Sequence, residues 1–339
     1  PEPDLSLETI TSYTPASGRH RTEISGLELG QSYRVRAYAR GRRGTFYSEE
    51  QKFHVPVTFE SEVLEEYLIA RYDSDGDGYI SLAESAEVDE IALPDAGLTS
   101  LGGIEHCTAL RRLDISGNPV TQIPLPQPSA LKELSCGNSG IRDMNEIFEQ
   151  ARGLRRLSAQ GMLKDGVKLY LLTGLESLDA SDSALGAINI KYNIALTSLV
   201  LRNCGITGLD LFCNTAIKAL DCRGCTMLKT VNLLEGQEIE GININMDNGR
   251  FIPDGTHVLY TAKIEDTAFK NFLCDNFDTD YDGIVSATEA AKIGEMKIER
   301  NRYSGISSLH GVEMFKSLRK LSVSGQNLMA LDLSENTEL

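Results

Sequence analysis

The sequence predicts an α/β solenoid with helical caps, preceded by a small β unit. Three observations predict it: leucines that recur every 21 residues, two acidic dodecapeptides of one pattern, and an alternating segment near the start of the chain. The 339 residues carry 33 Lys+Arg against 49 Asp+Glu, a formal charge of −16. Such a field would repel a phosphate backbone, so we expect no nucleic-acid partner. No apolar run is long enough for a membrane span.

The small β unit is expected over residues 1–57. The alternating positions of its clearest strand, which we expect to be half-buried, are Tyr33, Val35, Ala37 and Ala39. A final strand is expected near residues 47–55. Leu27, Gly30 and Tyr33 have the spacing of a tyrosine corner, so the unit resembles the latter part of a fibronectin type III domain. An unrelated β linker is the alternative.

Two acidic dodecapeptides, at 73–84 and 278–289, share Asp at positions 1, 3 and 5, Gly at 6 and Glu at 12. Oxygen ligands at positions 1, 3, 5, 7, 9 and 12 form the shell that Ca²⁺ prefers, and Gly at position 6 permits the sharp turn. Both segments resemble EF-hand loops, and we expect calcium at each. The predicted ligands are Asp73, Asp75, Asp77, Tyr79, Ser81 and Glu84 in the first loop, and Asp278, Asp280, Asp282, Ile284, Ser286 and Glu289 in the second.

Amphipathic patterns flank each loop. Residues 62–72 and 266–277 predict entering helices, and residues 81–88 and 286–293 predict short exit helices. Sensor EF-hands act in pairs, whereas these loops are far apart in the chain. We therefore expect each loop to belong to a helical cap that calcium stabilises. A solvated acidic turn without metal is the alternative.

The repeats follow the frame LxxLxLxxNxL with a spacing of 21 residues, widened once to 23. The frame resembles the leucine-rich repeat, which implies stacked units of a short strand and a return segment. The ninth position is Asn118 in one copy but Ser, Met, Cys or Gln in the others, so an internal ladder of hydrogen bonds is expected only in part. Asn193, Asn214 and Asn336 are expected in tight turns. The fourth position of the frame is Leu113, Leu134, Leu157, Leu178, Leu199, Leu220 and Leu321.

A longer repeat divides the chain, because residues 100–117 align with residues 308–325. The chain is expected to start within a β-sandwich and to stop within a solenoid. The predicted units are 1–57 (partial fibronectin type III-like unit), 58–97 (first calcium loop and cap), 98–235 (repeats), 236–262 (closing strands and junction), 263–303 (second loop and cap) and 304–339 (start of the second repeat block).

Two further features have a plain alternative. Cys222 and Cys225 have CxxC spacing, but both fall on inward repeat positions, so we expect packing rather than redox or zinc chemistry. A Cys204–Cys225 disulfide is a less favoured possibility. Outward basic residues could bind an anionic ligand or serve solubility. They are Arg111, Arg112, Lys132, Arg155 and Arg156.

Together these features resemble exported leucine-rich-repeat proteins of Bacteroides-type bacteria and, more distantly, internalins. The resemblance implies an extracellular or cell-surface location, with a lipid anchor possible outside this chain. No nucleophile, phosphate-loop or dinucleotide motif is present, so we expect no enzyme. The expected function is binding of a protein or glycan on the concave repeat face. The alternatives are a scaffold or spacer of a larger surface protein, or the non-catalytic part of an exported enzyme.

Overall fold

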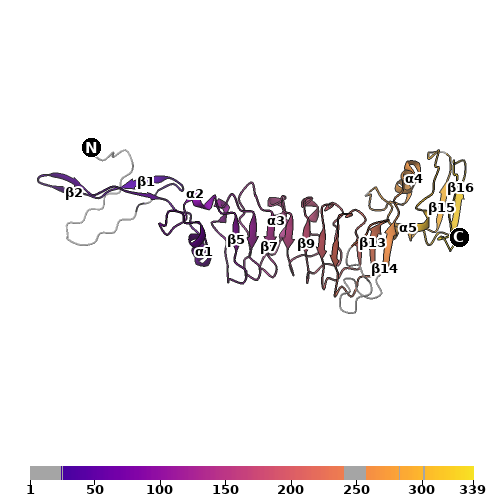
Figure 1. Ribbon diagram of the computed structural model, residues 1–339, viewed down its shortest axis with the longest axis horizontal. Coiled ribbons are helices and arrows are strands. Elements are labelled where there is room, and N and C mark those ends of the chain that lie inside the picture. Colours follow the sequence, from indigo (N-terminus) through magenta and orange to yellow (C-terminus); the bar gives the residue numbers. More distant parts are fainter. Residues whose placement is uncertain (1–23, 25, 240–256, 282, 301) are drawn as a thin grey trace.

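The computed structural model describes residues 24, 26–239, 257–281, 283–300 and 302–339. The molecule is elongated, and the N-terminal hairpin, the first caps and repeats, and the C-terminal elements follow one another along its long axis (Figure 1). A β hairpin at one end leads into the first block (residues 57–261), which is followed by the second block (residues 262–339). Two separate hydrophobic cores underlie these blocks, one from Val57 to Ile239 and the other from Ala262 to Leu318.

The N-terminal hairpin consists of two antiparallel strand pairs, β1 with β4 and β2 with β3. The Tyr33 hydroxyl accepts a hydrogen bond from the Glu28 N–H at 2.9 Å, as a tyrosine corner requires. The predicted half-burial is wrong, because Val35, Ala37 and Ala39 are exposed and no described element covers them. The fibronectin-like sandwich stays a prediction. The strands are β1 (Ser32–Val35), β2 (Tyr38–Gly41), β3 (Gly44–Tyr47) and β4 (Gln51–His54).

Each block opens with a helix, the acidic loop and a shorter helix, where the flanking patterns predicted helices. Ser61 caps the first long helix by accepting from the Leu64 N–H, and Asp266 caps the other by accepting from the Phe269 N–H. Both short helices begin with a capping box of Ser and Glu. These helices are α1 (Glu62–Tyr72), α2 (Leu82–Ser85), α4 (Thr267–Phe277) and α5 (Ala287–Ala290).

A seven-stranded parallel sheet runs along the first block. Its register places Leu113 beside Leu134, and each later leucine of the fourth position beside the next. These leucines point inward and their neighbours outward, as strand alternation requires. The repeat solenoid is therefore confirmed. The strands are β5 (Glu90–Ala92), β6 (Arg112–Asp114), β7 (Glu133–Ser135), β8 (Arg156–Ser158), β9 (Ser177–Asp179), β10 (Ser198–Val200) and β12 (Ala219–Asp221).

The return segments differ from repeat to repeat. The 3₁₀ helix η1 (Ile104–His106) occurs where apolar residues recur every third position, and η2 (Leu169–Leu171) lies further along. The unpredicted helix α3 (Met144–Gln150) occupies the repeat whose spacing widens to 23. Near the end of the block the returns form a parallel three-stranded sheet. Its strands are β11 (Gly208–Asp210), β13 (Thr230–Leu234) and β14 (His257–Thr261).

The second block repeats the beginning of the first. Strands β15 (Glu295–Ile298) and β16 (Lys320–Val323) pair in parallel, and η3 (Val312–Met314) matches η1. Its core is more aromatic, because the Phe272 ring meets those of Phe277 and Tyr303 edge-on, with centroids 5.8 and 5.3 Å apart.

The asparagines expected in tight turns also bury their side chains in a ladder of hydrogen bonds. Asn193, Asn214 and Asn336 are at most 3% exposed. The Asn193 amide donates to the carbonyls of Leu169 and Leu172 at 2.9 and 2.8 Å, and the other two make equivalent pairs of bonds. Each amide oxygen has no partner within the described structure. The prediction of tight turns is confirmed, because backbone hydrogen bonds close a turn on each side of all three asparagines. What the sequence did not show is that their side chains turn inward to bond the preceding return.

The ninth repeat position forms a second ladder. The Asn118 amide accepts from Ala96 and Leu98 and donates to Leu93. Cys204 and Cys225 take the same place later, and their thiols donate to carbonyls at 3.2 and 2.8 Å. Both are thiols rather than a disulfide. Packing of the CxxC cysteines on inward positions is confirmed, because they are fully buried.

Candidate metal centres

The first acidic loop wraps around Asp73, at the C-terminal end of α1. Its Oδ1 accepts from the Gly76 N–H at 2.7 Å, and its Oδ2 accepts from the Gly78 N–H at 2.9 Å. Gly76 and Gly78 have φ of 72° and 84°, a region that glycine enters without steric cost. The sharp turn predicted at the sixth position is therefore present.

Glu84, the twelfth residue, is fixed from both sides. Its Oε1 accepts from the Ser74 N–H and hydroxyl, both at 2.7 Å, and its Oε2 accepts from the Ser81 N–H and hydroxyl at 3.0 and 2.9 Å. Burial alone would raise the pKa of this carboxyl, but the hydrogen bonds from Ser81 and Ser74 outweigh it and lower the pKa to about 2. Glu84 is thus an ionised carboxylate held in place above about pH 3.

Three carboxylates converge in this loop. Asp73, Asp75 and Glu84 each present an oxygen within 4.8 Å of the others. Asp77 lies beside this cluster, where its Oδ1 accepts from the Tyr79 N–H at 2.9 Å. The predicted ligand at Tyr79 is its backbone carbonyl, and its side chain is exposed.

The second loop has the same arrangement. Asp278, Asp280 and Glu289 present oxygens within 4.8 Å of one another. Thr279 donates its N–H and hydroxyl to Glu289 Oε1, both at 2.7 Å, and Ser286 donates to Oε2 at 2.9 and 3.0 Å. Burial again opposes these bonds, and the net pKa of Glu289 is lowered. Two further predicted ligands belong to this loop, Asp282 and Ile284. Asp282 lies outside the described residues.

The donor chemistry of both clusters fits a hard cation. The converging atoms are all carboxylate oxygens, which Ca²⁺ and Mg²⁺ prefer over zinc and copper. Within the described ranges no other acidic, histidine or cysteine groups cluster as closely. Three carboxylates at this separation repel one another, and a divalent cation among them would reverse that repulsion.

The outward face of the seven-stranded sheet, which we call the strand face, is polar and largely charge-compensated. Its ion pairs join neighbouring repeats: Arg112 with Glu90 at 2.6 Å, Arg156 with Glu133 at 3.4 Å, and Arg155 with Glu176. The seven strands of this sheet carry no large apolar side chain that is exposed. Of the basic residues noted in the sequence, Arg112, Arg155 and Arg156 are therefore paired with acids of neighbouring repeats.

The last repeat concentrates charge around one buried acid. The Asp221 carboxylate forms ion pairs with the guanidinium groups of Arg202 and Arg223, both with a nitrogen–oxygen distance of 2.6 Å, and its side chain is 8% exposed. Burial opposes these bonds, but the two guanidinium groups lower the pKa of Asp221 overall.

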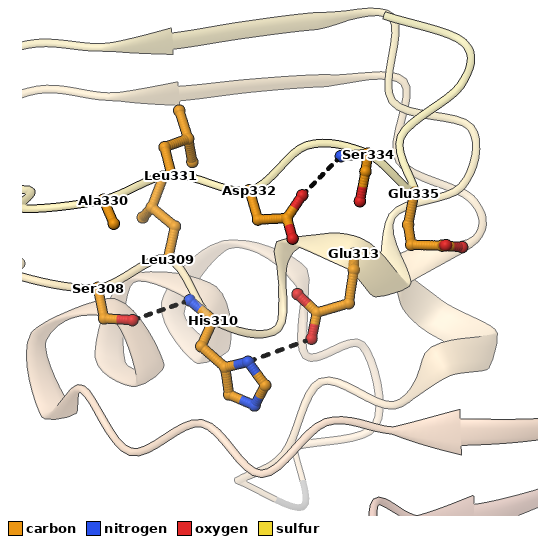
Figure 2. A pocket seen from close by; sticks show the side chains of 9 residues that line it. All are labelled: Ser308, Leu309, His310, Glu313, Ala330, Leu331, Asp332, Ser334 and Glu335. Atoms are coloured by element: carbon orange, nitrogen blue, oxygen red, sulfur yellow. Dashed lines mark hydrogen bonds and ion pairs between the residues drawn. The ribbon is translucent and has the colours of Figure 1, made fainter.

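An open pocket of about 370 Å³ lies on the return side of the second block (Figure 2). The His310 ring contacts Glu313 through Nδ1 at 3.4 Å and Glu235 of the first block through Nε2 at 3.0 Å. The Ser308 hydroxyl accepts from the backbone of His310 and does not bond its ring. Ser308 is therefore not paired with the His310 ring. Sequence reasoning missed this pocket because its walls are separate return segments.

Comparisons with known proteins complete the description. No protein-family model and no curated protein matches the chain. Similar solved structures are internalin-like leucine-rich-repeat proteins. An internalin C2 of Listeria monocytogenes is 16% identical over 60% of this chain and 94% of its own, with a TM-score of 0.44. An internalin F of the same species is 18% identical over 83% and 74%, with a TM-score of 0.40.

A third neighbour is a leucine-rich-repeat protein of Leptospira interrogans, 16% identical over 76% of this chain and 72% of its own, with a TM-score of 0.37. Because these TM-scores are below 0.5, the fold is argued from the strand register of this chain and not from these structures. Among the described helices, none has the length and apolar character to cross a membrane.

Proposed function

We propose that this protein is a calcium-stabilised, non-enzymatic leucine-rich-repeat protein that binds a protein or glycan at the bacterial surface or outside the cell. The observation that carries the proposal is the repeated cluster at the head of each block. In both, the glutamate at the twelfth position is already held by the same four hydrogen bonds, beside two aspartates of the loop.

Calcium stabilises the junction between cap and repeats. The first loop is joined to the preceding segment by the Val57 N–H, which donates to the Ile80 carbonyl at 2.8 Å, and both side chains are buried. Leu64 and Leu68 of α1 belong to the same core as the first repeats. A cation that organises this loop therefore stabilises the whole end of the core. Millimolar calcium outside the cell would fill even weak loops of this type.

Calorimetric titration of chelator-treated protein, with native mass spectrometry, tests the metal proposal. We expect two calcium ions per chain, and the loss of one each in Asp73→Asn and Asp278→Asn. Glu87→Gln is the matched control, because Glu87 is an exposed acid next to the first cap and outside the cluster. Protein that takes up no calcium at millimolar concentration would contradict the proposal.

Ligand binding is assigned to the strand face. Ser135 and Ser158 lie side by side on the middle strands β7 and β8, two residues after the paired Glu133 and Arg156, and a ligand would meet small polar groups there. Calcium-loaded protein should be screened on glycan arrays and against extracellular proteins. Ser158→Trp should abolish a genuine interaction, whereas Glu146→Trp, on helix α3 among the returns, should leave it intact.

A spacer within a larger surface protein is the second candidate. It is favoured by the paired charges and by the lack of exposed large apolar side chains on the strand face, since a binding interface depends on apolar or aromatic anchor residues that the partner buries. Ligand screens that stay negative, with calcium binding intact, would favour the spacer. A catalytic domain elsewhere in the same gene product would indicate the non-catalytic part of an exported enzyme.

Location is tested separately. Surface proteolysis of intact cells should cleave the protein if it is exported, and lipid labelling of the full gene product would reveal an anchor. Protection from protease until the cells are lysed would contradict a surface location.

A further inference from the structure

We infer that Lys191, a residue of the first block, is a tethered cation that competes with calcium for Asp280 and thereby weakens the second calcium site. This inference rests on the proposed calcium function. Lys191 Nζ lies 4.0 Å from Asp280 Oδ2, although the two residues are in different blocks. Asp280 is one of the three acids that converge in the second loop.

The solenoid holds Lys191 in position. Its N–H donates to the Asn189 side chain at 3.3 Å, and Asn193, two residues later, is fixed by the buried ladder. The Lys191 side chain is only 23% exposed, and its ammonium lies 5.5 Å from the centre of the Tyr192 ring. The charge is thus presented by a rigid return turn rather than by a free surface side chain.

The second loop is equally fixed against the first block. The Ala287 N–H donates to the Thr261 hydroxyl at 3.0 Å, and that hydroxyl donates to Asn232 Oδ1 at 2.9 Å. Thr261 and Asn232 are buried on adjacent strands, β14 and β13. The loop cannot move away from Lys191 without breaking these buried bonds.

The two calcium loops therefore differ in the charges that lie beside their acidic ligands. An ammonium beside Asp280 already compensates part of the negative charge, and it repels an incoming divalent cation. Calcium must either displace Lys191 from Asp280 or bind beside it. In the first loop, no described lysine or arginine forms an ion pair with Asp73, Asp75 or Glu84, so calcium there meets the full charge of its ligands.

The test compares calcium titrations of the full chain. Lys191→Met should tighten the second site roughly threefold to tenfold and leave the first unchanged, and Lys191→Arg should behave as wild type. Lys168→Met is the control, because Lys168 is also a return-segment lysine of the first block but pairs with Glu149, outside both loops. Asp75→Asn and Asp280→Asn assign each dissociation constant to its loop. Added salt should shrink the Lys191→Met effect.

The outcomes separate this inference from the calcium proposal. If wild type binds two calcium ions and Lys191→Met alters neither constant, the inference is wrong and the calcium proposal stands. If Lys191→Met instead changes the calcium dissociation constant of the first loop, which is the one lost in Asp75→Asn, the inference is also wrong. If neither wild type nor Lys191→Met binds calcium at the second loop, the inference and the proposal for that loop both fail. Melting in EDTA checks that each variant is folded.

Discussion

The two blocks begin with the same cap but attach it to their first strand in different ways. In the first block the Tyr72 hydroxyl donates to Asp89 and to the Glu90 carbonyl, both at 3.1 Å, and the Tyr67 hydroxyl accepts from Ala92. In the second block the equivalent residues are Phe277 and Phe272, which pack edge-on in an aromatic cluster. The loops are alike because their ligand chemistry constrains them, whereas the attachment tolerates either hydrogen bonds or ring packing.

The largest expected effect tests the aromatic attachment. Phe272 is 4% exposed, so Phe272→Ala should destabilise the second block by about 3–5 kcal/mol. In the first block, Tyr67→Phe removes only a hydroxyl contact and should cost about 1 kcal/mol. Urea unfolding of both variants measures the difference. Equal losses would show that the two attachments do not differ in kind.

Calcium removal should affect both caps. At a calcium concentration 100 times the dissociation constant, each filled site adds about 2.7 kcal/mol to the native state. Chelation with EGTA should therefore lower the melting temperature by about 5–10 °C, as measured by calorimetry. At limiting calcium, the second block should melt first if its site is the weaker. Unchanged melting in protein shown to bind calcium would refute the stabilising role.

Two equivalent glycines provide a finer comparison. Gly103 and Gly311 have φ of 106° and 103°. A Cβ at Gly103 would meet the Thr58 carbonyl oxygen at 2.8 Å, whereas at Gly311 it would meet the flexible end of Ile264. Gly103→Ala should therefore cost about 2 kcal/mol and Gly311→Ala about 1 kcal/mol, by chemical unfolding. The reverse order would mean that the backbone near Thr58 yields more readily than the Ile264 side chain.

The smallest expected effect concerns the polar contacts of the first block. The folded pKa of Asp221 is lowered, so its contribution to stability is present above the unfolded pKa of about 4 and is lost as pH falls through the folded value. Asp221→Asn should cost about 1 kcal/mol at pH 7 and progressively less below pH 4. Unfolding of both proteins across this range checks it. A constant difference would exclude the ionised carboxylate as the source.

The sequence predicts the periodic parts of this fold well. The leucines at the fourth repeat position predict the strand register directly, because each leucine is buried away from water only when it stacks on the leucine of the next repeat. The helices flanking each loop follow from apolar spacing. Helix α3 was missed because its apolar residues, Met144, Ile147 and Phe148, span less than two turns, too short a pattern to show a period.

Features that depend on long-range contacts could not be predicted from the sequence. Asn193 is typical of a turn and does lie in one, but only the contact with the preceding repeat shows that its side-chain amide turns inward. The contact between Lys191 and Asp280 likewise has no local signal, because it depends on how one block meets the next. The metal-ligand pattern was readable in advance because all of its residues lie within twelve positions of one another.

Both buried ladders have a direction. The Asn118 amide reaches back to Leu93, the Cys225 thiol to Leu201, and the Asn214 amide to Ile190 and Asn193. The carbonyls of one repeat are therefore satisfied by the repeat that follows it. On a ribosome, each repeat would be completed only once its successor had emerged. We therefore expect each repeat to fold stably during translation only after the next repeat has emerged from the ribosome.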